Sequence, residues 1–442
     1  MGYSPASVQH DAHGKALALN LDPSIYGTMA EIGAGQEVAR WFLSVGAASG
    51  TVAKTISAYD KKVSDDIYGG GTRYVSKERV GAMLEYEYKL LLDRLNPDRG
   101  KDTRFFAFAD TVAARNYRGT NQQHGWLGIC FQTEPSSEPS QIVLHINLRD
   151  STAQLQQQAL GILGVNLIYA VFYQRMGIDL FLAGLFDELS IARIEIDVIE
   201  FNGSAFPAED ARVWCLALLR HQMAHVVLFD TQGKVTEPSS VLRKRPLLAM
   251  RGSFSHPELF DPGLFQAANQ QLLAEGTTFE REPVTLLEMT IRHVSSDETL
   301  AGPEMLACIQ QLTRQGFVMI TDYPETYLLS RYLRRHSTEP VRFIMGVAAA
   351  AKILHETFYQ DLPGALLEGV GRLFASNVKL YVAPMPSRAF NAAVSDLSGA
   401  FTVEESEKTL VTLDDLAPSI PGLHLFEYLR ACGRVVALQL GR

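Results

Sequence analysis

Three short segments in the first third of the chain have the hydrophobic pattern of β-strands. They cover residues 105–112, 126–132 and 141–149, are rich in aromatic and β-branched residues, and are separated by turn-forming segments. In the last segment every second residue from Ile142 to Leu148 is aliphatic, so one face of this strand is expected to meet a core and the other to meet water. We predict a small antiparallel meander of three strands.

The chain before this meander has the apolar spacing of helices. Residues 23–56 repeat apolar positions at helical intervals around glycines, which predicts two short helices. A third helix is predicted from Ser76, an N-cap residue, to Leu95, which precedes an Asn-Pro breaker. Residues 1–20 are polar, and we expect a tail that is ordered only if a neighbouring lobe or a second subunit covers it.

After Asp150, helical segments alternate with short, nearly continuous apolar runs. Such runs are typical of parallel strands that are covered on both faces. Strands are predicted at residues 193–201, 225–230, 246–250, 317–321, 342–347 and 378–384, and helices near residues 152–175, 207–222, 263–274, 303–315, 324–335, 347–358 and 363–374. The alternation favours an α/β, Rossmann-like, mostly parallel and doubly wound sheet over residues 190–385, which would bind a ligand at the carboxyl ends of its strands.

The length of the chain favours more than one domain, because single cores stop growing at roughly 250–300 residues and this chain has 442. After the tail we predict an N-terminal α+β lobe with the meander over residues 21–150. An α/β domain over residues 151–385 follows. Residues 386–442 are predicted to form a C-terminal extension with a terminal helix.

Composition narrows the class of protein. A hydrophobic fraction of 47% and a charged fraction of 20% are those of an ordinary folded protein, and a net charge of −9 gives no attraction to nucleic acid or anionic lipid. The first residues lack the pattern of a secretory signal, and the most apolar window, 159–173, is short of the roughly 20 residues that span a bilayer. We therefore expect a soluble, cytoplasmic protein with no nucleic-acid partner and no membrane partner, and we interpret 159–173 as a core helix.

The four cysteines lie far apart in sequence, with no Cys-x-x-Cys pair. We interpret them as buried thiols in a reducing compartment. His221 and His225 form the one His-x-x-x-His pair, but Gln222 stands where a zinc protease has its glutamate, and a strand is predicted to start at His225. We favour the alternative that these are two unrelated histidines at the end of a helix, and we therefore expect no metal site.

Two further segments contain residues that suit binding. The segment GAGQEVAR, which starts at Gly33, opens a predicted helix whose free N–H groups suit an anion; the alternative is a glycine-rich turn. The loop from Ala114 to His124 contains Arg115 among several amide side chains, and His124 suits a proton carrier. Its alternative is a solvated loop tip.

Glu195 and Asp197 lie two residues apart in a predicted strand. Their carboxylates are therefore expected on one face, at a separation of roughly 6 to 7 Å, which suits an acid/base pair or a metal. The alternative is a strand edge that is charged to prevent aggregation.

A strand that leads into a glycine-containing loop lies at Pro246–Phe260. With Gly252-Ser253-Phe254 it resembles the opening motif of nicotinate-nucleotide adenylyltransferases, in which a strand leads into a Gly-Thr-Phe-Asp-Pro-type loop and then a His-x-Gly-His pair that steadies the phosphates of ATP. Here Ser255-His256 replaces Asp-Pro, and no His-x-Gly-His follows.

The chain is also similar, over most of its length, to a bacterial family without an established activity, through IYGTMAEIGAGQEVAR, TVAKTISAYD, HGWLGICFQ and NVKLYVAP. Members of that family often carry the labels adenylyltransferase or TonB-dependent receptor. The receptor label conflicts with this sequence, because an outer-membrane barrel needs many alternating strands and an export signal. The adenylyltransferase label implies nucleotidyl transfer from ATP.

The sequence therefore favours an oligomeric protein that binds a nucleotide or another phosphate-bearing small molecule near Arg251, Gly252, Ser253 and His256. Arg251 is expected to pair with the anion, and Ser253 and the loop amides to donate hydrogen bonds to it. Two alternatives stay open: a self-assembling scaffold or filament-type structural protein, and an adenylyltransferase-like nucleotidyltransferase. The sequence assigns no catalytic residue and no cofactor.

Overall fold

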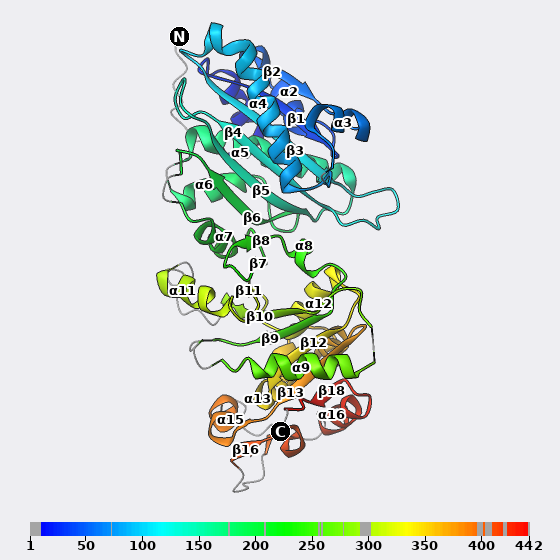
Figure 1. Cartoon of the computed structure of the whole chain (residues 1–442). Coiled ribbons are helices and arrows are strands. Elements are labelled where there is room, and N and C mark those ends of the chain that lie inside the picture. Colours follow the sequence, from blue (N-terminus) through cyan, green and yellow to red (C-terminus); the bar gives the residue numbers. More distant parts are fainter. Residues whose placement is uncertain are drawn as a thin grey trace. The chain divides into compact units, whose positions relative to one another are not determined.

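The computed structural model describes residues 10–440, except for residues 72, 176, 207–208, 255–256, 258–259, 277, 292–301, 396–400, 403–408 and 419–421. The chain divides into two compact units, Met1–His225 and Val226–Arg442 (Figure 1). The sequence pattern predicted a boundary at residue 150. The boundary lies further along the chain because the helices and the strand that follow the meander pack on the meander's own sheet.

A six-stranded mixed sheet forms the centre of the first unit. Its order is β2-β1-β3-β4-β5-β6, with β1 at Ile25–Ile32, β2 at Val52–Ile56, β3 at Arg104–Ala113, β4 at His124–Phe131, β5 at Ser140–Leu148 and β6 at Ile194–Asn202. Strands β2, β1 and β3 run parallel, whereas β3, β4, β5 and β6 pair antiparallel. The predicted meander is confirmed as β3, β4 and β5, within a larger sheet.

The prediction of two helices over residues 23–56 is wrong in part. This segment contains β1 and β2, with one α-helix, α2 (Glu37–Ser44), between them. β1 pairs with a strand on each side and is buried along most of its length. A strand that is covered on both faces is apolar at successive positions, so its periodicity does not distinguish it from a buried helix.

The prediction that residues 193–201 belong to the C-terminal sheet is also wrong. These residues form β6, which pairs antiparallel with β5, and the register shifts between His145 and Ile146. The helices between β5 and β6 therefore lead into an antiparallel neighbour instead of a parallel crossover. Nothing in the apolar run itself specifies the direction of pairing.

Helices cover both faces of the first sheet. α4 (Lys77–Arg99) packs on the face of β3 that carries Phe105. α5 (Ala153–Tyr173) packs on the opposite face, where Gly164 lies close to Phe108. Among the described residues α5 is the helix that is long and apolar enough to cross a membrane, and 78% of its most apolar window is buried inside the protein. This is the packing expected of the predicted core helix.

The predicted polar tail contains a buried helix, α1 (Ala12–Asn20), which packs against α5. Its Lys15 is fully buried. The Lys15 ammonium donates to Asn166 Oδ1, to the carbonyl of Gly184 and to Asp187 Oδ2, each at 2.8 Å. Three acceptors offset the cost of removing this ammonium from water, and they anchor the N-terminal segment within the unit.

An eight-stranded sheet with a Rossmann strand order forms the centre of the second unit. Its order is β18-β13-β12-β9-β10-β11-β7-β8, with β7 at Val226–Phe229, β8 at Val235–Thr236, β9 at Leu247–Arg251, β10 at Val284–Thr290, β11 at Phe317–Thr321, β12 at Val341–Gly346, β13 at Val378–Ala383 and β18 at Val435–Ala437. The strands from β18 to β11 run parallel, and β7 and β8 add an antiparallel edge. Numbered along the chain, the parallel strands lie 6-5-4-1-2-3, the doubly wound order of Rossmann folds. The predicted α/β, Rossmann-like sheet is therefore confirmed.

Three strands of this sheet, β8, β10 and β18, were not predicted from the sequence. β10 joins β9 to β11, and the polar residues Thr285 and Glu288 interrupt its apolar run. β18 has only three residues, too few for a periodic pattern. It follows helix α16 (Gly422–Ala431), so the predicted C-terminal extension contributes both a helix and the outermost parallel strand.

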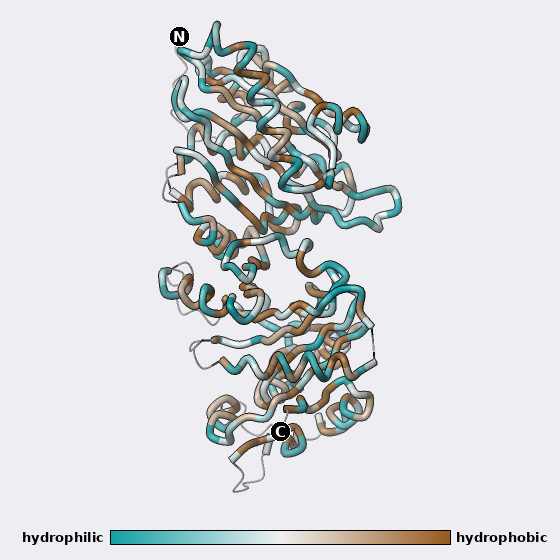
Figure 2. The backbone as a smooth tube through the Cα atoms, viewed as in Figure 1, coloured by the Kyte–Doolittle hydropathy of each residue, from teal (hydrophilic) through white to brown (hydrophobic). Residues whose placement is uncertain are grey.

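In each unit the hydrophobic residues concentrate on the strands and on the helices that cover them (Figure 2). The other helices of the first unit are α3 (Lys61–Tyr68), α6 (Ile178–Leu185) and α7 (Ala211–Arg220). Among its described residues, the second unit also contains the α-helices α8 (Pro238–Leu242), α9 (Gly263–Ala274), α11 (Pro303–Leu312), α12 (Thr326–His336), α13 (Val347–Ile353), α14 (Ala365–Leu373) and α15 (Ser387–Val394).

Candidate functional site

A pocket of about 730 Å³ opens at the carboxyl edge of the second sheet. It lies beside the loops that follow β9 and β12, the neighbouring strands at which the strand order reverses. From β9 the chain continues to β10 on one side, and from β12 it continues to β13 on the other. The two loops therefore diverge and leave a crevice, which is where open α/β sheets bind their ligands.

The pocket combines an apolar wall with polar groups. The wall consists of Ala348, Ala349, Ile353, Phe358, Tyr359, Met385 and Ala393, and the side chains that carry polar groups are Arg251, Ser253, Glu325, Thr326 and Lys352. Phe358 is 38% exposed, so its ring is accessible to a guest. A mostly apolar crevice with a few convergent polar groups is typical of small-molecule sites.

Arg251 lines this pocket, as the sequence pattern placed it, but most of its guanidinium is already bonded. Nε donates to Glu288 Oε2 at 2.6 Å, Nη2 donates to Glu288 Oε1 at 3.0 Å and to the carbonyl of Tyr323, and Nη1 donates to the carbonyl of Pro324 at 3.1 Å. Glu288 is fully buried, so it needs this cation. The expected pairing of Arg251 with a bound anion would compete with these bonds.

The loop after β9 supplies two of the three other predicted binding residues to the pocket, Gly252 and Ser253. The amide of Gly252 continues the ladder of the sheet and donates to the carbonyl of Glu288 at 3.1 Å. This amide is therefore engaged, in contrast to the free loop amides that we expected. Ser253 is exposed, and His256 lies outside the described residues.

Sequence reasoning missed Thr326, Lys352 and Phe358. Thr326 begins α12, directly after the loop that follows β11, and Lys352 and Phe358 follow β12. A signal was available for Lys352, because this residue lies in a helix that directly follows a strand, and open α/β sheets bind ligands at the carboxyl ends of their strands. The strand order that brings these segments beside the loop after β9 was not readable from the sequence.

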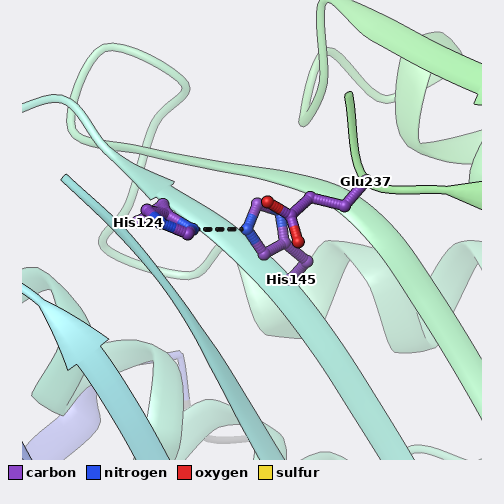
Figure 3. A group of neighbouring side chains, drawn as sticks. All are labelled: His124, His145 and Glu237. Atoms are coloured by element: carbon purple, nitrogen blue, oxygen red, sulfur yellow. Dashed lines mark hydrogen bonds between the residues drawn. The ribbon is translucent and has the colours of Figure 1, made fainter. Parts of the chain in front are cut away.

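A second cluster of polar groups lies in the first unit and includes His124, another predicted site residue. His124 on β4 and His145 on β5 point toward each other, and the distance from His124 Nδ1 to His145 Nε2 is 3.0 Å (Figure 3). The other nitrogen of His145, Nδ1, lies 2.5 Å from Asp197 Oδ1. Asn147 donates to the second oxygen, Asp197 Oδ2, at 2.9 Å. His124 is therefore a buried member of a hydrogen-bonded group of side chains and not part of a solvated loop tip.

Arg115, another predicted site residue, lies in the loop between β3 and β4. Its side chain is exposed, and its backbone N–H donates to Gln156 Oε1 at 2.8 Å. Polar groups of the loop bond to one another, as when the amide of Asn116 donates to Asn121 Oδ1 at 2.9 Å. A role for Arg115 in binding stays a prediction.

Glu195 and Asp197 have separate partners, although the sequence pattern predicts that they share one site. Glu195 Oε1 accepts the backbone N–H of His225 at 3.0 Å, and Glu195 Oε2 pairs with Arg149. The register shift beside His145 directs Asp197 to that histidine. Asp197 is the extra residue of β6 at this bulge, and the two carboxylates bond to different groups.

The helix start after Gly33, predicted as an anion site, is occupied by a carboxylate of the chain itself. Glu31 accepts the N–H groups of Val38 and Ala39, both at 2.9 Å. Glu31 is fully buried and lies opposite Asp110 in the register of β1 and β3. Burial raises the pKa of Glu31 to about 7, and burial together with the Glu31 charge raises the pKa of Asp110 well above its ordinary value.

His221 and His225 do not form a shared site in this structure. α7 ends at Arg220, and Gln222 has a positive φ of 54°, so the helix does not continue to His225. His221 Nε2 lies 2.8 Å from Asp179 Oδ1. The structure therefore agrees with the alternative interpretation, in which His221 and His225 are two unrelated histidines at the end of a helix.

The cysteines are thiols without disulfides, but only Cys215 is fully buried. Cys130 and Cys308 are half-buried, and Cys432 is exposed. Burial raises the pKa of Cys130 to about 12, which keeps this group protonated at neutral pH. The interpretation of four buried thiols is therefore wrong for Cys432.

No protein-family model and no curated protein sequence matches the chain. Solved structures that resemble part of it include two competence or damage-inducible proteins and a competence-damaged protein (CinA) superfamily protein. CihA from Agrobacterium tumefaciens is 19% identical with a TM-score of 0.28, over 39% of this chain and 99% of that one. The protein from Enterobacter asburiae is 12% identical with a TM-score of 0.27, over 36% and 96%. A CinA superfamily protein from Enterobacter cloacae is 11% identical with a TM-score of 0.27, over 38% and 97%. Likeness at this level assigns neither a family nor an activity.

Proposed function

We propose that the second unit binds a nucleotide or another phosphate-bearing small molecule in the pocket beside β9 and β12. The observation that carries this proposal is the position of the pocket at the point where the Rossmann strand order reverses. Its volume of about 730 Å³ falls within the range of about 300–1,000 Å³ that is typical of small-molecule sites.

We assign the polar groups of the pocket to different parts of a nucleotide. Lys352, Thr326 and the first N–H groups of α12 suit the phosphate, because a helix N-terminus has unpaired N–H groups and a positive end to its dipole. Phe358 suits the face of a base. Glu325 lies at the same rim, and its carboxylate suits ribose hydroxyl groups.

In this proposal Arg251 supports the site and does not contact the phosphate. Its bonds to the carbonyls of Tyr323 and Pro324 hold the chain just before Thr326, where α12 begins. The guanidinium thus fixes the position of the N–H groups that are assigned to the ligand. This replaces the direct ion pair that the sequence suggested for Arg251.

A thermal-shift screen tests this proposal, with ATP, NAD precursors, sugar phosphates and inorganic phosphate as probes. A ligand at 100 times its dissociation constant stabilises the folded protein by about 2.7 kcal/mol, which gives a measurable rise in Tm. We expect such a rise with at least one phosphate-bearing compound. An unchanged Tm with every nucleotide and every sugar phosphate would count against a binding site in this pocket.

A further inference from the structure

We propose that His124 and His145 in the first unit bind a divalent transition-metal ion such as Zn²⁺, with Asp197 as the carboxylate that orients His145. This site lies in the first sheet and is independent of the nucleotide pocket. The two histidines come from neighbouring strands, and their facing ring nitrogens, His124 Nδ1 and His145 Nε2, are 3.0 Å apart.

The separation of these two nitrogens is close to the one that a metal requires. Histidine nitrogens lie about 2.0–2.1 Å from Zn²⁺, and two of them at a tetrahedral angle are therefore about 3.3 Å apart. The observed 3.0 Å differs from this by a few tenths of an ångström. For both nitrogens to bind one ion, the rings must turn so that their lone pairs face the ion instead of each other.

Asp197 prepares His145 to be a ligand. Its Oδ1 lies 2.5 Å from His145 Nδ1, so the imidazole donates its proton there and its Nε2 carries the lone pair. Asn147 holds the other carboxylate oxygen at 2.9 Å, which fixes the direction of the carboxylate. A histidine that donates one N–H to a carboxylate and offers its other nitrogen to the ion is the usual arrangement in zinc sites.

The sheet geometry builds this arrangement from several strands. His145 pairs with Val198 and Ile146 pairs with Ile196, so the register shift leaves Asp197 as the extra residue of β6, and its carboxylate bonds to the His145 ring. The indole of Trp126 packs on the His145 ring with centroids 4.9 Å apart. His145 is fully buried, so packing and hydrogen bonds together fix its orientation.

Two imidazoles occupy two positions of a tetrahedral ion and leave the others to water or to further oxygen and nitrogen ligands. Only neutral imidazole binds a metal, so His124 would move its proton from Nδ1 to Nε2 when the ion enters. If either ring is protonated, that proton is released instead. Metal affinity is therefore expected to fall as the pH is lowered through the range in which histidine titrates.

The test is calorimetric titration of Zn²⁺ alone into the full chain after treatment with a chelator, together with the visible spectrum of the Co²⁺ form. We expect about one ion per chain and the intense absorption of tetrahedral Co²⁺. His145→Gln and His124→Gln should abolish this binding. Asp197→Asn, which removes the orienting carboxylate, should weaken it about 10- to 100-fold.

His221→Gln is the matched control, because His221 also bonds to an aspartate but lies at the end of α7. It should bind Zn²⁺ as the natural protein does. Circular dichroism of each variant establishes that it is folded. If a variant does not fold, NMR of histidine ring nitrogens in the natural chain decides, because Zn²⁺ should shift His124 Nδ1 and His145 Nε2 first. Absence of stoichiometric binding, binding that survives in folded His145→Gln, or unshifted resonances of these two nitrogens would overturn the proposal.

Discussion

Arg251 and Glu288 form a two-point ion pair across β9 and β10, with Nε 2.6 Å from Oε2 and Nη2 3.0 Å from Oε1. The hydroxyl of Thr321 on β11 donates to the same carboxylate at 2.6 Å. Three neighbouring strands are thus tied together just below the rim of the pocket. The sequence suggested that the Arg251 guanidinium binds a ligand. In the structure this guanidinium stabilises the edge of the sheet.

Replacement of Arg251 should therefore lower the free energy of unfolding of the second unit. Arg251→Ala leaves the buried Glu288 carboxylate without its cation, and breaking such a pair costs about 3–5 kcal/mol. Urea unfolding measures this loss. The double variant Arg251→Met with Glu288→Met removes both charges and should recover most of the stability. If Arg251→Ala abolishes ligand binding at unchanged stability, Arg251 contacts the ligand directly.

Phe358 should distinguish a nucleotide from a simple phosphate. Loss of a stacked aromatic ring costs about 1–3 kcal/mol per base, so Phe358→Ala should weaken nucleotide binding about 5- to 150-fold. It should leave the binding of inorganic phosphate unchanged. The control is Leu367→Ala, which truncates another exposed apolar side chain of the same unit. Equal losses for nucleotide and phosphate in Phe358→Ala would exclude stacking.

The buried pair of Glu31 and Asp110 should make the stability depend on pH. Their pKa values are raised in the folded state, so folding favours the protonated forms. The contribution of these two protonated carboxyls to the stability of the folded protein is fully present below about pH 4, where the carboxyls of the unfolded chain are also protonated. This contribution is lost as the pH rises. For Glu31, between its ordinary value of 4.5 and about 7, the loss amounts to about 3 kcal/mol.

Asp110→Asn removes one of these carboxyls and keeps an oxygen that can accept the N–H of Ile32, which now bonds to Asp110 Oδ1 at 3.2 Å. The variant should be more stable than the natural protein at pH 8, by about 1–3 kcal/mol, and its stability should vary less between pH 4 and pH 8. Chemical unfolding over this pH range measures both effects. A variant that is less stable at pH 8 would show that the charged pair is tolerated.

Lys15 should be needed to anchor the N-terminal helix. Lys15→Met removes the donor to three acceptors, of which Asn166 is itself fully buried. We expect a loss of about 2–4 kcal/mol in the stability of the first unit, with faster amide exchange in α1. Lys62→Met, at an exposed position of α3, is the control. Unchanged exchange in α1 would contradict an anchoring role.

The predictions from sequence succeeded where one element determines its own pattern. The meander was readable because β5 has a strict alternation from Ile142 to Leu148, and α4 was readable from its Ser76 cap. β1 and β10 were missed or mistaken. The hydrophobic pattern of β1 is set by the neighbours that cover both of its faces. The pattern of β10 is broken by polar residues such as Glu288. Both conditions depend on segments that are distant in sequence.

The sequence suggests a candidate site at residues that line the pocket, but it does not indicate the bonds that Arg251 makes. The strand at Leu247–Arg251 and its Gly252 loop suffice to suggest a carboxyl-edge site. The partner of Arg251 is 37 residues away on a strand that was not recognised. In the same way, the pairing of His124 with His145 depends on the register of β4 and β5, which no local pattern specifies.

In the proposed function, the pocket beside β9 and β12 binds a phosphate-bearing molecule through Lys352. Calorimetric titration of nucleotides into the full chain tests it most directly, with Lys352→Gln beside Lys234→Gln, an exposed lysine in the turn between β7 and β8. We predict one site per chain, an affinity that falls at least about 10-fold in Lys352→Gln, and no change in Lys234→Gln. Nucleotide binding that is equally strong in both variants, or no binding in the natural chain, would contradict the claim.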